Sequence, residues 1–271
     1  MTTRPIHAKP QSRSKRASRA VASRLSRPVA LLSSHCGRVH RGWVVVAVGM
    51  LAFFVANGID RWSFHLLLAA HPHRLGTRDW YGLFKSMGSP LIWLAIAAAL
   101  WLHDLVSRGR RHPGESRTTR LGLASVRAGL LLVTLLLAGV LGDFMKLVAR
   151  RERPMLHDGI HVFRSWAVDT FSTSDLGLPS SHAISAFAAA FMMSRFFPAS
   201  APVLLAMAAG CAASRLLVGA HFLSDVVLAA VLSYALTSWL WREATARPRL
   251  AGGLPAYALP PRDVPADSTS V

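Results

Sequence analysis

Six long apolar runs, each bounded by polar or charged residues, dominate the chain from residue 42 onwards. They cover approximately 42–58, 89–106, 121–148, 182–197, 202–219 and 222–241. Each run is about long enough for a helix to cross a bilayer, in some cases with help from flanking residues. Tryptophans near the run ends are typical of anchors at the membrane interface: Trp43, Trp93, Trp101, Trp239 and Trp241. The pattern predicts an all-α fold, a polytopic bundle of six transmembrane helices.

Composition agrees with membrane insertion. Of the 271 residues, 52% are hydrophobic and only 16% are charged, and the mean hydropathy is +0.35. The net charge of +18 would fit a nucleic-acid-binding protein, but the basic residues flank the apolar runs instead of forming one binding face. We therefore expect no nucleic acid partner. Cys36 and Cys211 lie in the N-terminal tail and within a run, so two free thiols are expected and not a disulfide.

The N-terminal segment 1–42 holds ten Lys or Arg residues and no Asp or Glu. This predicts a disordered, basic cytoplasmic tail that touches anionic lipid, with an organellar transit peptide as the alternative. The membrane domain is expected to span 43–241, and residues 242–271 to form a Pro-rich cytoplasmic tail, disordered over 247–265.

Charge in the connections predicts the orientation. Five arginines and one glutamate, Glu115, lie within 107–120, so this loop, both termini and the turn near 195–201 are expected to be cytoplasmic. The connections 59–88 and 149–181 and the turn near Gly219 then face the other side. The connection 59–88 is expected to be partly helical and to lie at the interface.

On this topology, two histidines lie at the non-cytoplasmic ends of the runs. His221 and Asp225 are four residues apart, so on a helix they share a face and the carboxylate can hold one imidazole nitrogen. The other nitrogen is then free to act as a nucleophile or a base. Ser180 and Ser181 suit a helix N-cap whose free N–H groups bind anions, and the adjacent His182 can protonate a departing oxygen.

Basic residues accompany them. Lys146 and Arg153 are seven residues apart, about two helical turns, so both can face one anion before Pro154 stops the helix. Arg215 ends the fifth run. For Arg150 and Arg151 the favoured interpretation is snorkelling to lipid phosphates. Ionisable groups at span ends are costly unless partnered, and a cationic cup with two histidines suits phosphoryl transfer.

Three motifs carry a family resemblance. Residues 146–154 fit K-x6-RP, residues 179–182 are similar to PSGH, and residues 214–225 match SR-x5-H-x3-D. In this order, within 43–241, they resemble the type 2 phosphatidic acid phosphatase superfamily, its integral-membrane branch. The one departure is Ser181, which stands where the family pattern has Gly; it keeps the backbone N–H and adds a hydroxyl.

The resemblance implies a role for each residue. His221 would attack phosphorus to form a phosphohistidine, Asp225 would orient it, and His182 would protonate the leaving oxygen and then activate water. The phosphate oxygens would be held by Lys146, Arg153, Ser180, Ser181 and Arg215. No metal or other cofactor is expected.

The expected function is that of a membrane lipid phosphatase. Isoprenyl diphosphate, phosphatidic acid, phosphatidylglycerol phosphate and lipid A phosphate all remain open as substrates. A lipid phosphotransferase with the same intermediate is one alternative, and a non-catalytic lipid-binding or transport protein is another. We expect a bacterial cytoplasmic membrane, with the site facing the periplasm or exterior. The oligomeric state is open.

The loop 155–178 offers a second, weaker site. His157 and His161 could bind a metal if they lay on one helix, but no further well-placed ligand is evident. We expect the loop to shape the mouth of the site instead. Asp143 is expected to pair with Lys146 or with a hydroxyl.

Overall fold

The computed structural model describes residues 42–67, 79–255 and 257. The chain divides into two compact units, Met1–Val45 and Val46–Val271. Of the first unit, only the opening of a helix, Gly42–Leu67, is described. The predicted basic tail over residues 1–41 and Cys36 therefore lie outside the described residues.

The described part of the second unit is helical, and its only β-type pairings are two isolated bridges. After the N-terminal helix come α2 (Asp79–Ser86), α3 (Pro90–Arg111), α4 (Arg117–Ala149), η2 (Pro154–Leu156), α5 (Ser181–Phe196), η3 (Pro198–Ser200), α6 (Ala201–Leu217), α7 (Leu223–Ala246) and α8 (Pro248–Ala251). The predicted all-α class is confirmed. The connection 59–88 is partly helical as expected, since its described residues belong mostly to the N-terminal helix and α2.

Five described helices are long and apolar enough to cross a membrane: Gly42–Leu67, Pro90–Arg111, Arg117–Ala149, Pro198–Leu217 and Leu223–Ala246. These five helices support an integral membrane protein. The fourth predicted span corresponds to α5, which has 16 residues. Such a helix is about 24 Å long, whereas the hydrocarbon core is about 30 Å thick. The predicted count of six spans is therefore not confirmed.

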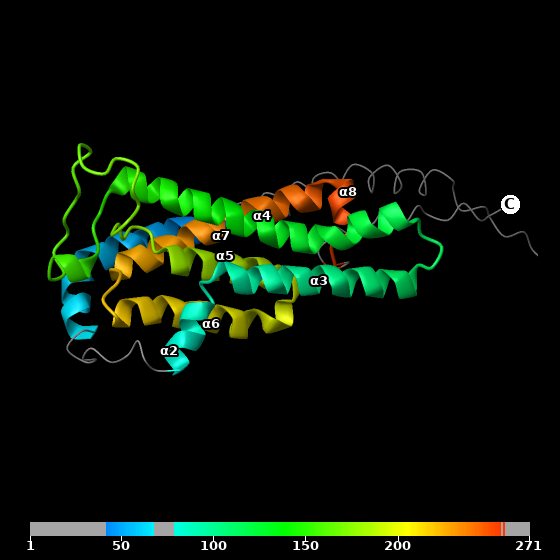
Figure 1. Cartoon of the computed structure of the whole chain (residues 1–271), viewed down its shortest axis with the longest axis horizontal. Helices are drawn as coiled ribbons and strands as arrows, with labels where there is room; N and C mark the ends of the chain where they lie inside the picture. The colour runs from blue at the N-terminus through cyan, green and yellow to red at the C-terminus, as the bar shows by residue number, and fades with distance from the viewer. Residues whose placement is uncertain (1–41, 68–78, 256, 258–271) are drawn as a thin grey trace, which may run out of the picture. The chain divides into compact units, whose positions relative to one another are not determined.

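Helix α5 is at the centre of the packing, in contact with α4, α6 and α7. Figure 1 shows these helices running alongside one another. Small residues allow the close approach, because Ala183, Ala186, Ala188, Ala189 and Ala190 of α5 are buried completely. An α5 that is covered on several sides holds its N-terminal end firmly, and that end carries the candidate site.

Helix α2 is fixed against this bundle by aromatic side chains. The ring of Phe84 packs on Gly210 of α6, where an added Cβ would come within 2.3 Å of it. Trp93 is only 1% exposed, and its indole N–H donates to the carbonyl of Met87 at 2.7 Å. The expectation that Trp93 is an interfacial anchor is therefore wrong, because it pins the α2–α3 turn.

The Pro-rich stretch 247–265 also differs from its prediction as far as it is described. Helix α8 lies within it, Leu254 is buried, and Gly253 packs so closely on Val126 that an added Cβ would lie 2.5 Å from it. Arg108 of α3 donates to the carbonyl of Gly252 at 2.7 Å. These contacts order residues 248–255, while 258–271 lie outside the described residues.

Candidate active site

The C-terminal end of α4, the N-terminal end of α5 and the α6–α7 turn lie at the same end of the bundle (Figure 1, left). The ammonium group of Lys146 on α4 donates to the hydroxyl of Ser181 on α5. Gly219 makes the α6–α7 turn with a φ of +65°, and a Cβ there would meet the Met155 sulfur at 2.7 Å. The predicted reversal at Gly219 is confirmed.

His221 lies in this turn and not on a helix, since α7 begins at Leu223. The expectation that His221 and Asp225 share a helical face is therefore wrong in detail. Asp225 is the third residue of α7 and reaches back, so that its Oδ2 accepts from the Phe222 N–H at 2.8 Å and lies 3.4 Å from Nδ1 of His221. The contact between His221 and Asp225 therefore depends on the cap that Asp225 makes at the start of α7.

The carbonyl of Gly177 gives His221 a second partner. It lies 3.0 Å from Nδ1 of the imidazole. A carbonyl oxygen can only accept, so Nδ1 carries the proton and Nε2 keeps its lone pair. Gly177 is itself held by its N–H, which donates to the Arg151 carbonyl at 2.7 Å. The loop before α5 therefore sets the histidine tautomer.

Asp225 has a buried cationic partner, Arg151. The guanidinium donates to Oδ1 of Asp225 and to the hydroxyl of Ser224 at 2.7 Å. It also lies over the Phe222 ring, 4.9 Å from the centroid. Arg151 is 1% exposed. The snorkelling interpretation is thus wrong for this residue, whose charge is neutralised inside the protein.

Asp60 of the N-terminal helix completes this network. It is 1% exposed, and its carboxylate accepts from the Ser224 N–H at 2.9 Å and from the Ser224 hydroxyl. It also lies 3.5 Å from Arg151 and 3.1 Å from Nε2 of His161. Two carboxylates, Asp60 and Asp225, thus enclose one guanidinium. The sequence does contain a signal for Asp60, because an acidic residue next to an apolar run is costly unless it has a partner.

Arg150 organises the loop that carries Gly177. It takes the left-handed conformation, with a φ of 52°, and ends α4. Its buried guanidinium donates to four loop carbonyls, those of Arg164, Ser165, Val168 and Thr170. The snorkelling interpretation is therefore wrong for Arg150 as well. Its guanidinium N–H groups bond to loop carbonyls that, in an irregular loop, have no regular backbone N–H partners.

Two further cations, Arg153 and Arg215, act electrostatically on both His182 and His221. Arg153 lies beyond the end of α4, so the proposed helical face shared with Lys146 is wrong. Both Arg153 and Arg215 have a buried Nε atom with no hydrogen-bond partner among the described residues. Tyr81 of α2, which the sequence did not single out, accepts a hydrogen bond from Arg215 at 2.8 Å. Unpartnered guanidinium donors beside histidines are a fitting receptor for an anion.

His182 is placed by backbone contacts. Ser180 is the N-cap of α5 and accepts from the Ala183 N–H at 3.5 Å, as predicted. Gly88 lies against His182 so closely that an added Cβ would be 2.7 Å from its Cβ and 2.8 Å from its Cα. On the other side, the thiol of Cys211 is 3.8 Å from the His182 carbonyl. Cys211 is buried and free, as expected.

Electrostatic contact links the two histidines. Burial lowers the pKa of His182 to about 4, and the charges of Arg215, His221, Lys85 and Arg153 act in the same direction. Burial lowers the pKa of His221 below its ordinary value, and Arg215 and Arg153 lower it further, while the hydrogen bond with Asp225 opposes them. A neutral His221 at neutral pH is the form that can act as a nucleophile.

The histidines of the loop serve other partners. His157 bonds to Glu152, which also accepts from Arg164 at 2.9 Å, and Arg164 and His157 lower the pKa of this carboxyl. His157 follows the short η2 helix in a turn and His161 lies in the irregular chain beyond it, so the two share no helical face. Over the described residues, no group of three or more His, Cys, Asp or Glu could hold a metal ion.

Asp143 lies 3.3 Å from Lys146, and this predicted pair is confirmed.

Comparison with known proteins gives one family. The sequence model of the PAP2 superfamily matches residues 127–249, a segment that includes Lys146, His182, Arg215, His221 and Asp225. No curated protein matches the chain. Among solved structures, the chain is similar to the first transmembrane PAP2 type phosphatidylglycerolphosphate phosphatase from Bacillus subtilis. The identity is 16%, the match covers 72% of this chain and 93% of that one, and the TM-score is 0.49.

Proposed function

Because the chain belongs to the PAP2 superfamily, we propose that it is a membrane phosphatase that hydrolyses a lipid phosphate through a phosphohistidine. One observation carries the proposal. His221 has Nδ1 fixed as a donor toward Gly177, which leaves Nε2 as a nucleophile, and two arginines with unpartnered buried donors act on it.

In the first step, Nε2 of His221 attacks phosphorus, and the bond from phosphorus to the leaving oxygen breaks. His182, which takes up a proton when the negative charge of the bound phosphate lies beside it, gives that proton to the leaving oxygen. The imidazolium-like charge on phosphorylated His221 is stabilised by Asp225. Arg153 and Arg215 lower the barrier by holding the equatorial oxygens, on which negative charge develops.

In the second step, water attacks the phosphohistidine. His182, now neutral, takes a proton from the water, the P–N bond breaks, and its electron pair returns to Nε2 of His221. Phosphate leaves and both histidines regain their starting states. Lys146, Ser180 and Ser181 assist in holding the phosphate, Ser180 through the N–H groups at the start of α5.

We propose that the reaction is metal-independent, since Lys146, Arg153 and Arg215 supply fixed positive charge where a metal ion does so in other phosphatases. The site is at the non-cytoplasmic ends of the third to sixth apolar segments, facing the periplasm of a bacterial inner membrane. This topology rests on the charge of the connections. At headgroup depth the lipid tail stays in the bilayer while its phosphate reaches the site.

Phosphate release in detergent micelles tests the function. The full-length protein should release phosphate from at least one lipid phosphate, vanadate should inhibit, and His221→Ala should reduce the rate to background while the protein still elutes as a monodisperse species. Transfer of phosphate to a second lipid instead of water would identify the phosphotransferase alternative. Specific lipid binding without any turnover would identify the non-catalytic one.

A further inference from the structure

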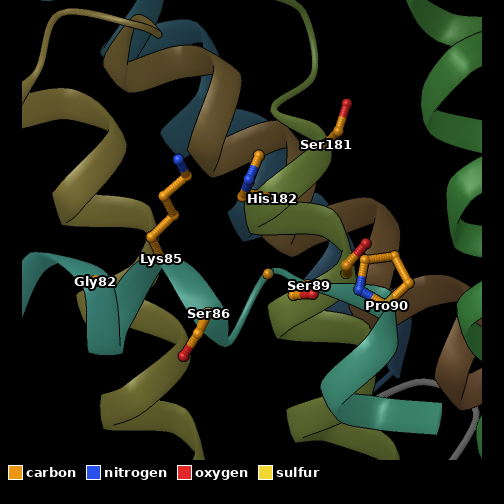
Figure 2. Close-up of a pocket in the computed structure, with 9 residues that line it drawn as sticks. Gly82, Lys85, Ser86, Ser89, Pro90, Ser181 and His182 are labelled. Atoms are coloured by element: carbon orange, nitrogen blue, oxygen red, sulfur yellow. The ribbon is translucent and has the colours of Figure 1, made fainter. Parts of the chain in front are cut away.

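The two histidines of the candidate site differ in the charges around them. Figure 2 shows His182 at the start of α5 beside a pocket, and the described residues that line this pocket include no acidic side chain. His221 instead lies 3.4 Å from the carboxylate of Asp225, and a second buried carboxylate, that of Asp60, contacts the same arginine as Asp225 does. The negative charge near the histidine pair is therefore on the His221 side.

The end of the N-terminal helix is fixed against the α6–α7 turn. The ring of Phe64 is 5% exposed and packs on Gly219, where an added Cβ would lie 3.2 Å from a ring carbon. One turn earlier, Asp60 accepts hydrogen bonds from the N–H and the hydroxyl of Ser224, the second residue of α7. The N–H groups in the first turn of a helix have no partner within it, so Asp60 caps α7 from another helix. Asp60 is therefore held beside the turn that carries His221.

Arg151 is shared between the two carboxylates. Its guanidinium donates to Oδ1 of Asp225, and its Nη1 lies 3.5 Å from Oδ2 of Asp60. All three side chains are at most 1% exposed, and charges inside a protein act on one another more strongly than charges in water. Two carboxylates and one guanidinium leave one negative charge in excess. If Asp60 were neutral, Arg151 would balance Asp225 and no excess would remain next to His221.

The other charged groups that act on His221 do not favour a positive imidazole. Arg215 of α6 and Arg153 beyond α4 oppose it, as does burial, and His182 of α5 interacts with it as a further base. Asp225 acts in the opposite direction, through its charge and through its hydrogen bond. The negative charge that remains on Asp225 therefore determines how well a positive imidazole is stabilised.

We propose that Asp60 is a positioning residue for His221: it shares the charge of Arg151, so that Asp225 keeps the negative charge that orients the imidazole and stabilises the phosphohistidine. The inference rests on the proposed phosphatase function and adds the N-terminal helix to its site. Asp60 lies outside residues 127–249, the segment that matches the PAP2 model, so the family match assigns it no role. A phosphate on Nε2 makes the ring cationic while Nδ1 keeps its proton. Without Asp60, this cation loses part of its counter-charge.

Titration of His221 tests the inference. The full-length protein with isotope-labelled histidine is titrated in detergent by NMR, and the His221 signal is identified by its loss in His221→Ala. Asp60→Asn keeps the size of the side chain and an acceptor for the Ser224 N–H but removes the charge. It should lower the pKa of His221 by about one unit and kcat by about tenfold. The acid limb of kcat/KM should move to lower pH with it.

A double variant separates charge from structure. Asp60→Asn with Arg151→Gln removes one charge of each sign, so the excess on Asp225 is restored and the pKa of His221 should return to the wild-type value. If Asp60 had no influence, the double variant would act as the loss of Arg151 alone and would raise this pKa above wild type. That result would overturn the inference even if Asp60→Asn alone did not fold.

Asp104→Asn is the matched control. Asp104 is also buried and also pairs with an arginine, because Arg127 donates to it at 2.7 Å. This pair lies in the C-terminal half of α3, whereas the start of α3 is the end next to His182. Asp104→Asn should therefore lower the melting temperature but leave the His221 titration and the acid limb unchanged.

His161 is the other titratable group that faces Asp60, at 3.1 Å. His161→Gln removes its titration and keeps an N–H donor, so Asp60→Asn should produce the same shift in that background. A shift that disappeared there would mean that His161 causes it, and would overturn the inference.

The two levels of the account fail in different ways. Turnover by the wild type, with the same His221 titration in Asp60→Asn, would overturn the inference and leave the phosphatase intact. The expected shift without turnover of any lipid would retain the positioning role and overturn the phosphatase. A slower Asp60→Asn enzyme with an unshifted acid limb would indicate a merely structural role and would also overturn the inference.

Discussion

The carbonyl oxygen of Gly177 lies 3.0 Å from Nδ1 of His221, so the loop before α5 fixes the protonation of a histidine placed 44 residues later. Gly177 is also close to the carboxylate that shares this nitrogen, because a Cβ at 177 would lie 3.0 Å from Oδ2 of Asp225. One loop residue therefore controls both hydrogen-bond partners of the imidazole.

Replacing Gly177 with Ala should lower kcat by about tenfold, because displacing Asp225 or the carbonyl by a fraction of an ångström misorients His221. KM should change little, since the cations that bind phosphate stay in place. Phosphate release against substrate concentration measures both constants. Gly139→Ala on α4, where an added Cβ meets nothing within 4 Å, is the matched control. Equal rates for the two variants would mean that Gly177 does not position His221.

Gly88→Ala should have a larger effect, a loss of about 10²-fold in kcat, because the new Cβ would overlap the backbone of His182. If the loss acts through proton donation, a lipid phosphate with an activated leaving group should recover most of the rate, since it needs no acid. A loss of the same size with both kinds of substrate would indicate general damage to the fold.

Asp60→Ala should destabilise the protein by about 3 kcal/mol, because it leaves the buried guanidinium of Arg151 with one carboxylate in place of two. Thermal unfolding in detergent measures this. Asp60→Asn keeps the shape and should cost less. Asp79→Ala, an exposed acid in the first turn of α2, is the control and should change stability by under about 0.5 kcal/mol. A similar melting temperature for Asp60→Ala and Asp79→Ala would contradict the structural role of Asp60.

The positions of the helices were well predicted from the sequence, since an apolar run long enough to cross a bilayer has few alternatives to a helix. The sequence also singled out His182, Arg215, His221 and Asp225, because ionisable side chains are costly in apolar runs unless they have partners; their role in a site stays a prediction. It missed what the irregular loop does. The contacts of the Gly177 carbonyl with His221 and of Arg150 with loop carbonyls could not be predicted. They involve backbone groups, which are the same at every residue and so leave no pattern in the sequence.

One further error and one unconfirmed prediction have physical causes. Arg151 was assigned to lipid because its partners, Asp60 and Asp225, are 91 and 74 residues away and only the fold brings them together. The fourth predicted span, 182–197, is not confirmed as a crossing helix, because residues buried among other helices are as apolar as residues that face lipid. A 16-residue helix can be mostly apolar and still be shorter than the hydrocarbon core of a bilayer.

The acid limb of activity should lie below pH 6.5, the ordinary pKa of histidine. Burial lowers the pKa of His221, so its imidazole stays neutral and nucleophilic as the pH falls through 6.5, and activity is lost only below that range. A profile of kcat/KM reports the groups of the free enzyme. An acid limb centred above pH 6.5 would contradict a neutral, buried nucleophile.

Covalent labelling tests the central claim, that His221 receives the phosphoryl group. The full-length protein is mixed with a lipid carrying a labelled terminal phosphate, quenched in alkali, digested and analysed by mass spectrometry. We predict an acid-labile, alkali-stable phosphate on His221 that accumulates in His182→Ala and is missing in His221→Ala. Label on any other residue, or turnover by His221→Ala at the wild-type rate, would contradict the account.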